Sequence, residues 1–285
     1  MNSEYAPTRR ASKIADWLEV TALTRGRPLT LTLLEALGTT HGYSAADVAL
    51  GVNSMARRRN LLRDAYPFRT AGGGISATSN ATHSPWSAML LMSAESPVRP
   101  SLDIAAAAEH LERITTVALA ELYGPGTEAI RFGWPSDVGR PPEFPDAIRW
   151  LAKQMSVPVG GSYRPPHRKD GGVDVVAWRP FPDGRSGFPV LLVQCTLERD
   201  YAHKASDIDL RVWSGWLRLD TDPATALAIP EVVPAGEVWN SLAARTIVLD
   251  RMRLAALTPH PATAEGSSLL NAWISITLEA LREET

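Results

Sequence analysis

The sequence has little of several features that would narrow its function at once. It holds one cysteine, Cys195, among 285 residues, which excludes an internal disulfide framework and a cysteine-rich zinc site. No apolar run reaches the ~20 residues of a membrane-spanning helix, and residues 1–10 lack the apolar segment of a signal peptide. We therefore expect a cytoplasmic protein that does not contact a membrane.

The chain as a whole also carries no net positive charge. The formal net charge is -2, so no global field draws the chain to nucleic acid, and any such contact must come from a local basic patch. The three consecutive glycines at 72–74 are not followed by the lysine of a phosphate-binding loop, and no dinucleotide fingerprint is present. These absences exclude the common nucleotide-dependent enzymes.

What remains is ordinary globular composition, 45% hydrophobic and 21% charged. Residues 1–100 predict a helical N-terminal region, with Ser12 and Ser44 as candidate N-caps. Apolar periodicity marks its helices at 12–23, 30–37 and 44–62. Glycines 72–74 and the prolines at 97 and 100 then interrupt the pattern, so we place a domain boundary near Ser101.

Residues 101–285 alternate between helical and strand patterns. Helices are expected at 102–123, 144–155, 200–207 and 269–281. Strands are expected at 129–132, 173–178, 188–196 and 246–249. This alternation predicts an α/β domain.

The strands at 173–178 and 188–196 carry the most informative residues. A hairpin centred on Gly184 pairs positions whose numbers sum to 368, which puts Asp174 opposite Gln194. Cross-strand partners have Cβ atoms ~5 Å apart, so a carboxylate and a carboxamide meet at one end of an apolar hairpin. Oxygen ligands of this kind suit Mg²⁺. A structural role is equally open, with Asp174 closing the strand entry and Gln194 making an edge hydrogen bond.

The segment resembles the PD-(D/E)xK nuclease superfamily, whose restriction-endonuclease-like core combines helices with a mixed central sheet. Within it, the sequence looks similar to a bacterial defence-associated group with a G-x-D-x-x-A-W strand, a D-G-R turn and a Q-C step before a lysine. The matching residues are Gly172 to Trp178, Asp183 to Arg185, Gln194-Cys195 and Lys204. The likeness extends over residues 102–254.

The resemblance implies a role for each matched residue. Asp174 and Gln194 match two metal-binding positions, Glu112 matches the acidic residue of the preceding helix, and Lys204 matches a catalytic lysine supplied from the following helix. Helical periodicity also puts Glu112 on the flank of the apolar stripe, where it can reach toward Asp174. Thr196 occupies the position two residues after Gln194 where the lysine usually stands. Only Asp174 and Glu112 are then anionic ligands.

Several basic residues are candidates for phosphate contacts. Arg164, Arg168 and Lys169 precede Asp174. Arg251 and Arg253 follow the strand expected at 246–249, where one or the other is expected to face substrate. An ion pair with Asp250 or a nearby acid is the alternative for Arg251. The cluster Arg57-Arg58-Arg59 is read as a solvated helix face.

The expected function is metal-dependent hydrolysis of phosphodiester bonds with Mg²⁺ or Mn²⁺. The resemblance implies DNA, or else RNA, as substrate in a bacterial restriction or anti-phage defence system. It also implies partner proteins of that system, and leaves open a homo-oligomer. Two alternatives stand beside it: a catalytically degenerate subunit that binds nucleic acid or proteins, and a small-molecule hydrolase that uses Cys195 or a serine.

Overall fold

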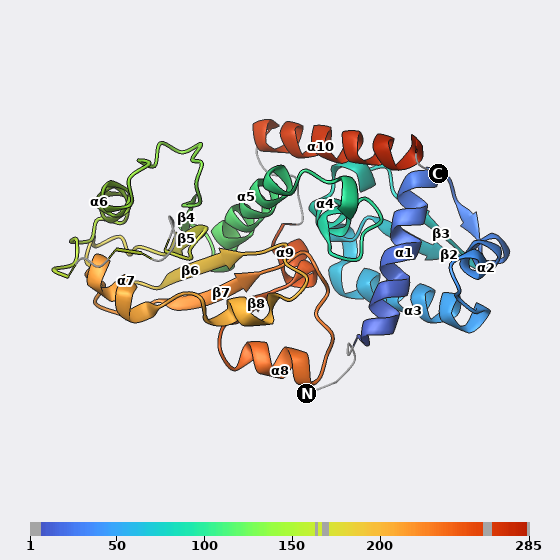
Figure 1. Ribbon diagram of the computed structural model, residues 1–285, viewed down its shortest axis with the longest axis horizontal. Helices are drawn as coiled ribbons and strands as arrows, with labels where there is room; N and C mark the ends of the chain where they lie inside the picture. The colour runs from blue at the N-terminus through green and yellow to red at the C-terminus, as the bar shows by residue number, and fades with distance from the viewer. Residues whose placement is uncertain (1–6, 163–164, 167–170, 259–263, 284–285) are drawn as a thin grey trace. The chain divides into compact units, whose positions relative to one another are not determined.

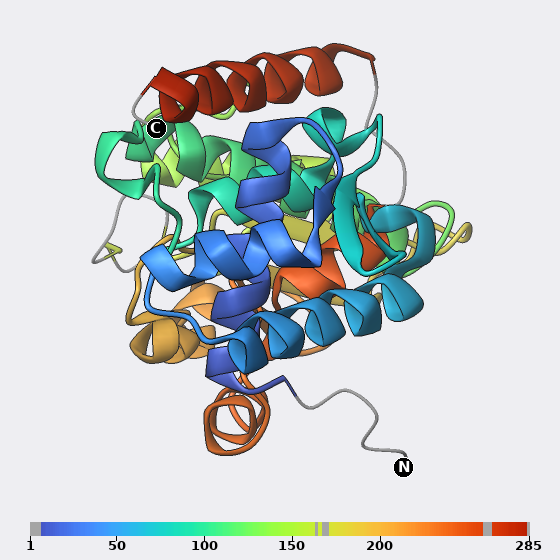
Figure 2. The same ribbon diagram turned by 90° about the vertical axis from the view of Figure 1, so that its right-hand side faces the viewer.

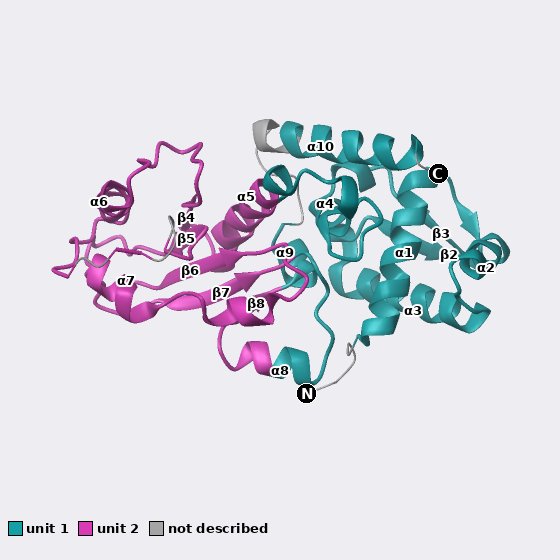
Figure 3. Ribbon diagram, viewed as in Figure 1, with its two compact units in different colours: residues 1–107, 230–240, 250–285 teal, residues 108–229, 241–249 magenta. Residues whose placement is uncertain are grey.

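A computed structural model describes residues 7–162, 165–166, 171–258 and 264–283, with backbone alone at 264–267. The chain divides into two compact units (Figure 3), which are described separately. Unit 1 comprises Met1–Ala107, Pro230–Asn240 and Asp250–Thr285, and unit 2 comprises Ala108–Ile229 and Ser241–Leu249. The sequence places a boundary near Ser101, and the first division between the two units falls after Ala107. The second half differs from the continuous 101–285 domain expected, because its C-terminal residues group with unit 1.

The fold is mixed α/β, and none of the described helices is long and apolar enough to cross a membrane. Unit 1 is built mainly from helices, which can be followed in Figure 2. Its helices are α1 (Arg9–Arg25), α2 (Leu31–Thr40), α3 (Ala45–Leu62), α4 (Pro85–Met92), α9 (Arg251–Leu257) and α10 (Ala264–Glu283), with short 3₁₀ turns at Arg63–Ala65, Ala81–His83 and Arg99–Ser101.

Local sequence explains how these helices begin and pack. Ser44 caps the start of α3, as the sequence predicts, and it forms a capping box with Asp47. Helix α1 begins earlier than expected, because Thr8 caps it instead of Ser12. Gly51 lets α3 approach α1 closely, since a Cβ at this position would lie 2.6 Å from Ile14 Cγ2.

Unit 1 also holds a small sheet that the sequence did not predict. Its antiparallel strands lie in the order β1 (Leu29–Thr30), β3 (Gly74–Ala77) and β2 (Phe68–Ala71). Gly72 and Gly73, which interrupt the helical pattern, have positive φ and form the turn between β2 and β3. The glycine run is therefore a hairpin turn.

Unit 2 is organised around a five-stranded mixed sheet (Figure 1) in the order β4-β5-β6-β7-β8. The strands are β4 (Glu128–Arg131), β5 (Val175–Trp178), β6 (Val190–Cys195), β7 (Ala224–Ala228) and β8 (Ile247–Leu249). The pairs β4–β5 and β5–β6 are antiparallel, whereas β6–β7 and β7–β8 are parallel. Its helices are α5 (Ile104–Leu122), α6 (Phe144–Met155), α7 (Leu210–Trp216) and α8 (Glu237–Ala243), of which α5 and α8 begin in unit 1.

The predicted hairpin register is confirmed. Val175 pairs with Val193, and Val176 pairs with Leu192, so each pair of numbers sums to 368. One face of this hairpin packs against α6 and α7 in an aromatic core that includes Phe144, Trp213 and Trp216. The other face meets α5, where the Cys195 thiol contacts Thr115 Oγ1 at 3.6 Å. Helix 144–155 is also confirmed, while the helix expected at 200–207 is a 3₁₀ segment, Tyr201–Ser206.

Candidate functional site

Asp174 stands at the entry of β5, where three strands meet. Its backbone N–H donates to Val193 O at 2.8 Å, and its carbonyl accepts from the N–H groups of Phe132 and Gly133 at 2.6 and 2.9 Å. The carboxylate oxygen Oδ2 accepts the Cys195 N–H at 2.7 Å. These bonds fix Asp174 between the end of β4 and the end of β6, with its side chain partly exposed.

Glu112 reaches the same end of the sheet from α5. Its Oε2 accepts from Arg131 Nη1 at 2.8 Å, and a Cβ at Gly133 would lie 2.6 Å from that oxygen. Gly133 is the residue whose N–H binds the Asp174 carbonyl. A side chain at position 133 would displace the Glu112 carboxylate, which therefore lies beside the backbone that anchors Asp174.

The pKa of the Cys195 thiol depends on the charges at this end of the sheet. Burial raises the pKa of Cys195 well above its ordinary value, and the negative charges of Asp174 and Glu112 raise it further. The thiol's hydrogen-bond partner is Thr115, whereas His203 Nε2 pairs with Glu198 Oε2 at 3.3 Å. The thiol is therefore not activated by that histidine, which removes the support for a Cys195 nucleophile.

Gln194 and Lys204 are connected through Asp207. The amide nitrogen of Gln194 donates to Asp207 Oδ2 at 3.4 Å, and Lys204 Nζ lies 3.8 Å from the same oxygen. Lys204 also pairs with Glu198 Oε1 at 2.7 Å, and only 10% of its side chain is exposed. Asp207 thus fixes the amide nitrogen of Gln194 on its own side and holds Lys204 next to it.

Arg131, at the end of β4, joins the acidic residues of this region into one network. Besides Glu112 it binds Asp137 Oδ1 at 2.9 Å, and Asp137 in turn contacts Arg113 at 2.7 Å. Burial alone would lower the pKa of Arg131, but its hydrogen bonds to Glu112 and Asp137 outweigh that effect and raise it. The Glu112 carboxylate therefore has a permanently charged protein partner.

Comparison with protein-family models, with curated proteins and with solved structures finds no match for this chain. The side chains of the site are therefore what indicates its chemistry. Asp174, Glu112 and Gln194 offer two carboxylates and an amide oxygen, the hard donors that Mg²⁺ and Mn²⁺ accept with waters and phosphate oxygens. Within the described ranges, no three His, Cys, Asp or Glu side chains gather as a metal site.

Sequence reasoning missed two residues of this region, Asp207 and Arg131. Asp207 follows Lys204 by three positions, a spacing that brings side chains together on a helical turn, and this signal was available. Arg131 looked like an ordinary strand residue, because its partners Glu112 and Asp137 belong to other elements.

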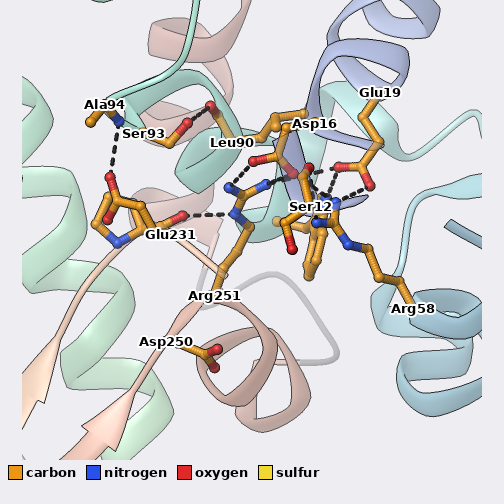
Figure 4. Close-up of polar contacts among 12 residues, drawn as sticks. Ser12, Asp16, Glu19, Arg58, Leu90, Ser93, Ala94, Glu231, Asp250 and Arg251 are labelled. Carbon is orange, nitrogen blue, oxygen red and sulfur yellow. Dashed lines mark hydrogen bonds and ion pairs between the residues drawn. The ribbon is translucent and has the colours of Figure 1, made fainter. Parts of the chain in front are cut away.

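The structure describes only part of the set of basic residues that was expected to contact phosphates. Arg164, Arg168 and Lys169 lie outside the described residues. Arg251 is fully buried in unit 1, so the expectation that it faces a nucleic acid is corrected. Its Nη2 binds Asp16 Oδ2 at 2.8 Å and its Nε donates to Pro230 O at 2.7 Å (Figure 4). The alternative expected for it, an ion pair, is what the structure contains, but with Asp16.

Arg251 belongs to a buried charged cluster composed of Asp16, Glu19, Arg58 and Arg251 (Figure 4). Arg58 Nη1 bridges Asp16 Oδ1 at 2.7 Å and Glu19 Oε1 at 2.6 Å, so Arg58 is not on a solvated helix face. Burial raises the pKa of Glu19, whereas the two guanidinium groups outweigh burial and lower the pKa of Asp16. Asp16 is therefore the ionised partner of both arginines.

Proposed function

We propose that unit 2 is a metal-dependent nuclease of the PD-(D/E)xK type that hydrolyses phosphodiester bonds of DNA, in a bacterial restriction or anti-phage defence system. The observation that carries the proposal is that the charges of Asp174 and Glu112 both act on the Cys195 thiol, at the end of a mixed sheet and next to Gln194 in the chain. The order along the chain supports it too: an acidic helix, a hairpin with Asp174 and Gln194, and then Lys204 follow one another as the resemblance implies.

A divalent cation at this site would neutralise charge on the scissile phosphate and lower the pKa of a bound water. Asp174 and Glu112 would hold it, with Gln194 contributing its amide oxygen. Asp207 positions that amide, because the amide nitrogen donates to Asp207. Cys195 N–H, bound to Asp174 Oδ2, keeps the carboxylate directed along the edge of the sheet.

Lys204 supplies the positive charge that the chemistry requires near the phosphate. Its ammonium group lies between Glu198 and Asp207 and is largely shielded from water. A shielded ammonium stabilises a developing oxyanion more strongly than one in bulk water.

One observation favours a second function, a degenerate nuclease-fold subunit that binds nucleic acid or partner proteins. Arg131 is almost fully buried and already neutralises Glu112. In addition, an amide stands at position 194 where a carboxylate would bind a cation more tightly. With Asp174 as the sole carboxylate facing a cation, metal affinity would be weak.

The test is nicking of supercoiled plasmid by the purified full chain with Mg²⁺ or Mn²⁺. We expect Asp174→Asn and Lys204→Met to lose at least ~100-fold in rate. Asp183→Asn, in the exposed turn of the same hairpin, and Lys153→Met, on the exposed face of α6, are matched controls that should retain it.

Activity that survives Asp174→Asn would refute the site. Absence of nicking, combined with absence of calorimetric Mn²⁺ binding that depends on Asp174, would instead support the degenerate subunit. A single-stranded RNA substrate in the same assay distinguishes RNA from DNA as the target.

A further inference from the structure

Helices α2 and α3 of unit 1 are joined by a short turn at residues 41–44 (Figure 1). Gly42 adopts a positive φ of 74°, and the Tyr43 N–H donates to Gly38 O at 2.8 Å, which ends α2 in a tight cap. Ser44 then caps the start of α3. Two helices joined by a turn of about four residues that contains glycine form a helix-turn-helix.

Close packing fixes these helices to each other and to α1. A Cβ at Gly38 of α2 would lie 2.9 Å from Val48 Cγ2 of α3. A Cβ at Gly51 of α3 would lie 2.6 Å from Ile14 Cγ2 of α1. The side of α3 that meets these neighbours is therefore buried, and its opposite side is the one left for a partner.

That opposite side, the outer face of α3, is exposed along the whole helix, and none of its described residues is acidic. It consists of Ala46, Ala49, Leu50, Asn53, Arg57, Asn60 and Leu61. At ~100° per residue, these positions fall within an arc of roughly 120°. Asn53 and Arg57 are neighbours near the middle of the arc, because they are four positions apart. Asparagine and arginine are the side chains that bind the edges of adenine and guanine with two hydrogen bonds.

Arginines follow the outer face along the chain. Arg63 comes directly after α3, and Arg69 lies on β2, an edge strand of the small sheet; both are exposed. Arg59 Nη1 donates to Tyr66 O at 3.0 Å, which ties the last turn of α3 to the start of β2. Residues 26–77 hold six arginines and three acidic residues, a net charge of +3 in a chain of net charge -2. This is the local basic patch that such a chain needs in order to bind a polyanion.

The dimensions of the outer face favour duplex DNA among the polyanions. An α-helix is ~10–12 Å across and fits the major groove of B-DNA, which is ~12 Å wide. The small side chains of Ala46 and Ala49 let the first turns of α3 approach the bases, and Leu50 offers an apolar contact for a thymine methyl group. The major groove of duplex RNA is too narrow and deep for side chains to reach its bases.

We propose that unit 1 binds duplex DNA with α3 in the major groove. Asn53 and Arg57 bind base edges, and Arg63 and Arg69 contact phosphates. The inference does not rest on the proposed nuclease, because it uses no residue of unit 2 and no metal ion.

The first experiment measures binding of the full chain to a fluorescein-labelled DNA duplex of random sequence, by fluorescence anisotropy in EDTA. Arg63→Ala and Arg69→Ala should each lower the slope of log K against log salt concentration by about 1. Ala46→Glu should raise Kd at least ~10-fold, because the new carboxylate repels phosphates. Arg245→Ala is the matched control and should change neither quantity, since Arg245 is an exposed arginine of unit 2 that bonds only to the nearby Ser241 in the described structure.

The second experiment tests base recognition. Duplexes with a randomised centre are selected by the wild type and sequenced to find the preferred site. On that site, Asn53→Ala and Arg57→Ala should each raise Kd roughly 5–150-fold and relax the preference at one base pair. Asn80→Ala, at an exposed position outside α3 and the hairpin, should leave Kd unchanged. Circular dichroism checks the fold, which Ala46→Glu should retain because an acidic residue is favourable in the first turn of a helix.

The proposal is overturned if no duplex binds at up to ~100 µM protein, if selection yields no preferred sequence, or if Ala46→Glu binds as tightly as the wild type. Duplex RNA that competes as well as duplex DNA would also overturn it. A chain that binds no DNA but sediments as a dimer, which Ala46→Glu dissociates, would assign the outer face to a second copy instead. EDTA removes the cation that nicking needs, so binding in EDTA and nicking with Mg²⁺ succeed or fail independently.

Discussion

Replacing Arg251 with alanine is expected to destabilise unit 1 severely. The guanidinium group is fully buried, makes two bonds to Asp16 and one to the Pro230 carbonyl, and stands beside Glu19. Its removal leaves Asp16 with Arg58 as its one remaining partner in the buried charged cluster. Breaking a buried ion pair in this way costs about 3–5 kcal/mol, a large share of the ~5–15 kcal/mol that stabilises a typical protein.

Urea unfolding followed by circular dichroism measures this loss. With a slope of about 2 kcal/mol per M, the midpoint should fall by roughly 2 M. Arg253→Ala is the matched control, since Arg253 is an exposed arginine of the same helix whose ring contact is with Trp239, and it should lose less than about 1 kcal/mol. Equal, small losses for both variants would refute the assignment of Arg251 to a buried charged cluster and reopen its role at a surface.

Three further predictions concern other groups. Burial raises the pKa of Glu231 from 4.5 to about 7, so the folded state binds this proton more tightly and the free energy of unfolding should fall between those two pH values. Glu231→Gln should remove this pH dependence. Its free energy of unfolding, measured in urea, should equal that of the wild type near pH 4.5 and exceed it most above pH 7. A difference that stays constant with pH would contradict the assignment. Because the pKa of Cys195 is raised, its thiol should react with a disulfide reagent at pH 8 at least ~10-fold more slowly in the folded chain than in urea, and equal rates would show an exposed thiolate. Gly133→Ala should displace the Glu112 carboxylate and weaken Mn²⁺ binding about 10–100-fold, as measured by calorimetry; unchanged affinity would exclude Glu112 from the metal site.

The parts of the fold that could be predicted are those encoded locally. The register of the β5–β6 hairpin follows from a glycine turn and period-2 alternation, both of which lie within one short segment. Helix α6 has a proline in its first turn and a strong apolar stripe, so its bounds agree with the prediction. Strand β7 was missed because it consists largely of alanine between prolines, and its identity depends on pairing with β6 and β8.

For the functional residues too, the sequence predicts neighbours within one segment but not partners that are distant in the chain. Asp174 and Gln194 could be brought together because both belong to the hairpin. Arg58 and Arg251 could not be understood from sequence, since the partners of Arg58 lie 42 and 39 positions away and that of Arg251 lies 235 positions away. A charged residue shows no local sign of whether it faces water or a distant carboxylate.

The separation between Asp16 and Arg251 also sets the order in which the chain can fold during synthesis. A ribosome adds ~5–20 residues per second, so roughly 10–50 s pass after Asp16 is made before its second guanidinium partner exists. Throughout that interval the growing N-terminal segment carries acidic side chains that its own helices would bury incompletely neutralised. Unit 2, whose residues end at Leu249, is therefore complete on the ribosome before unit 1. The emergence of α9 is then the event that allows the first-made residues to reach their final packing.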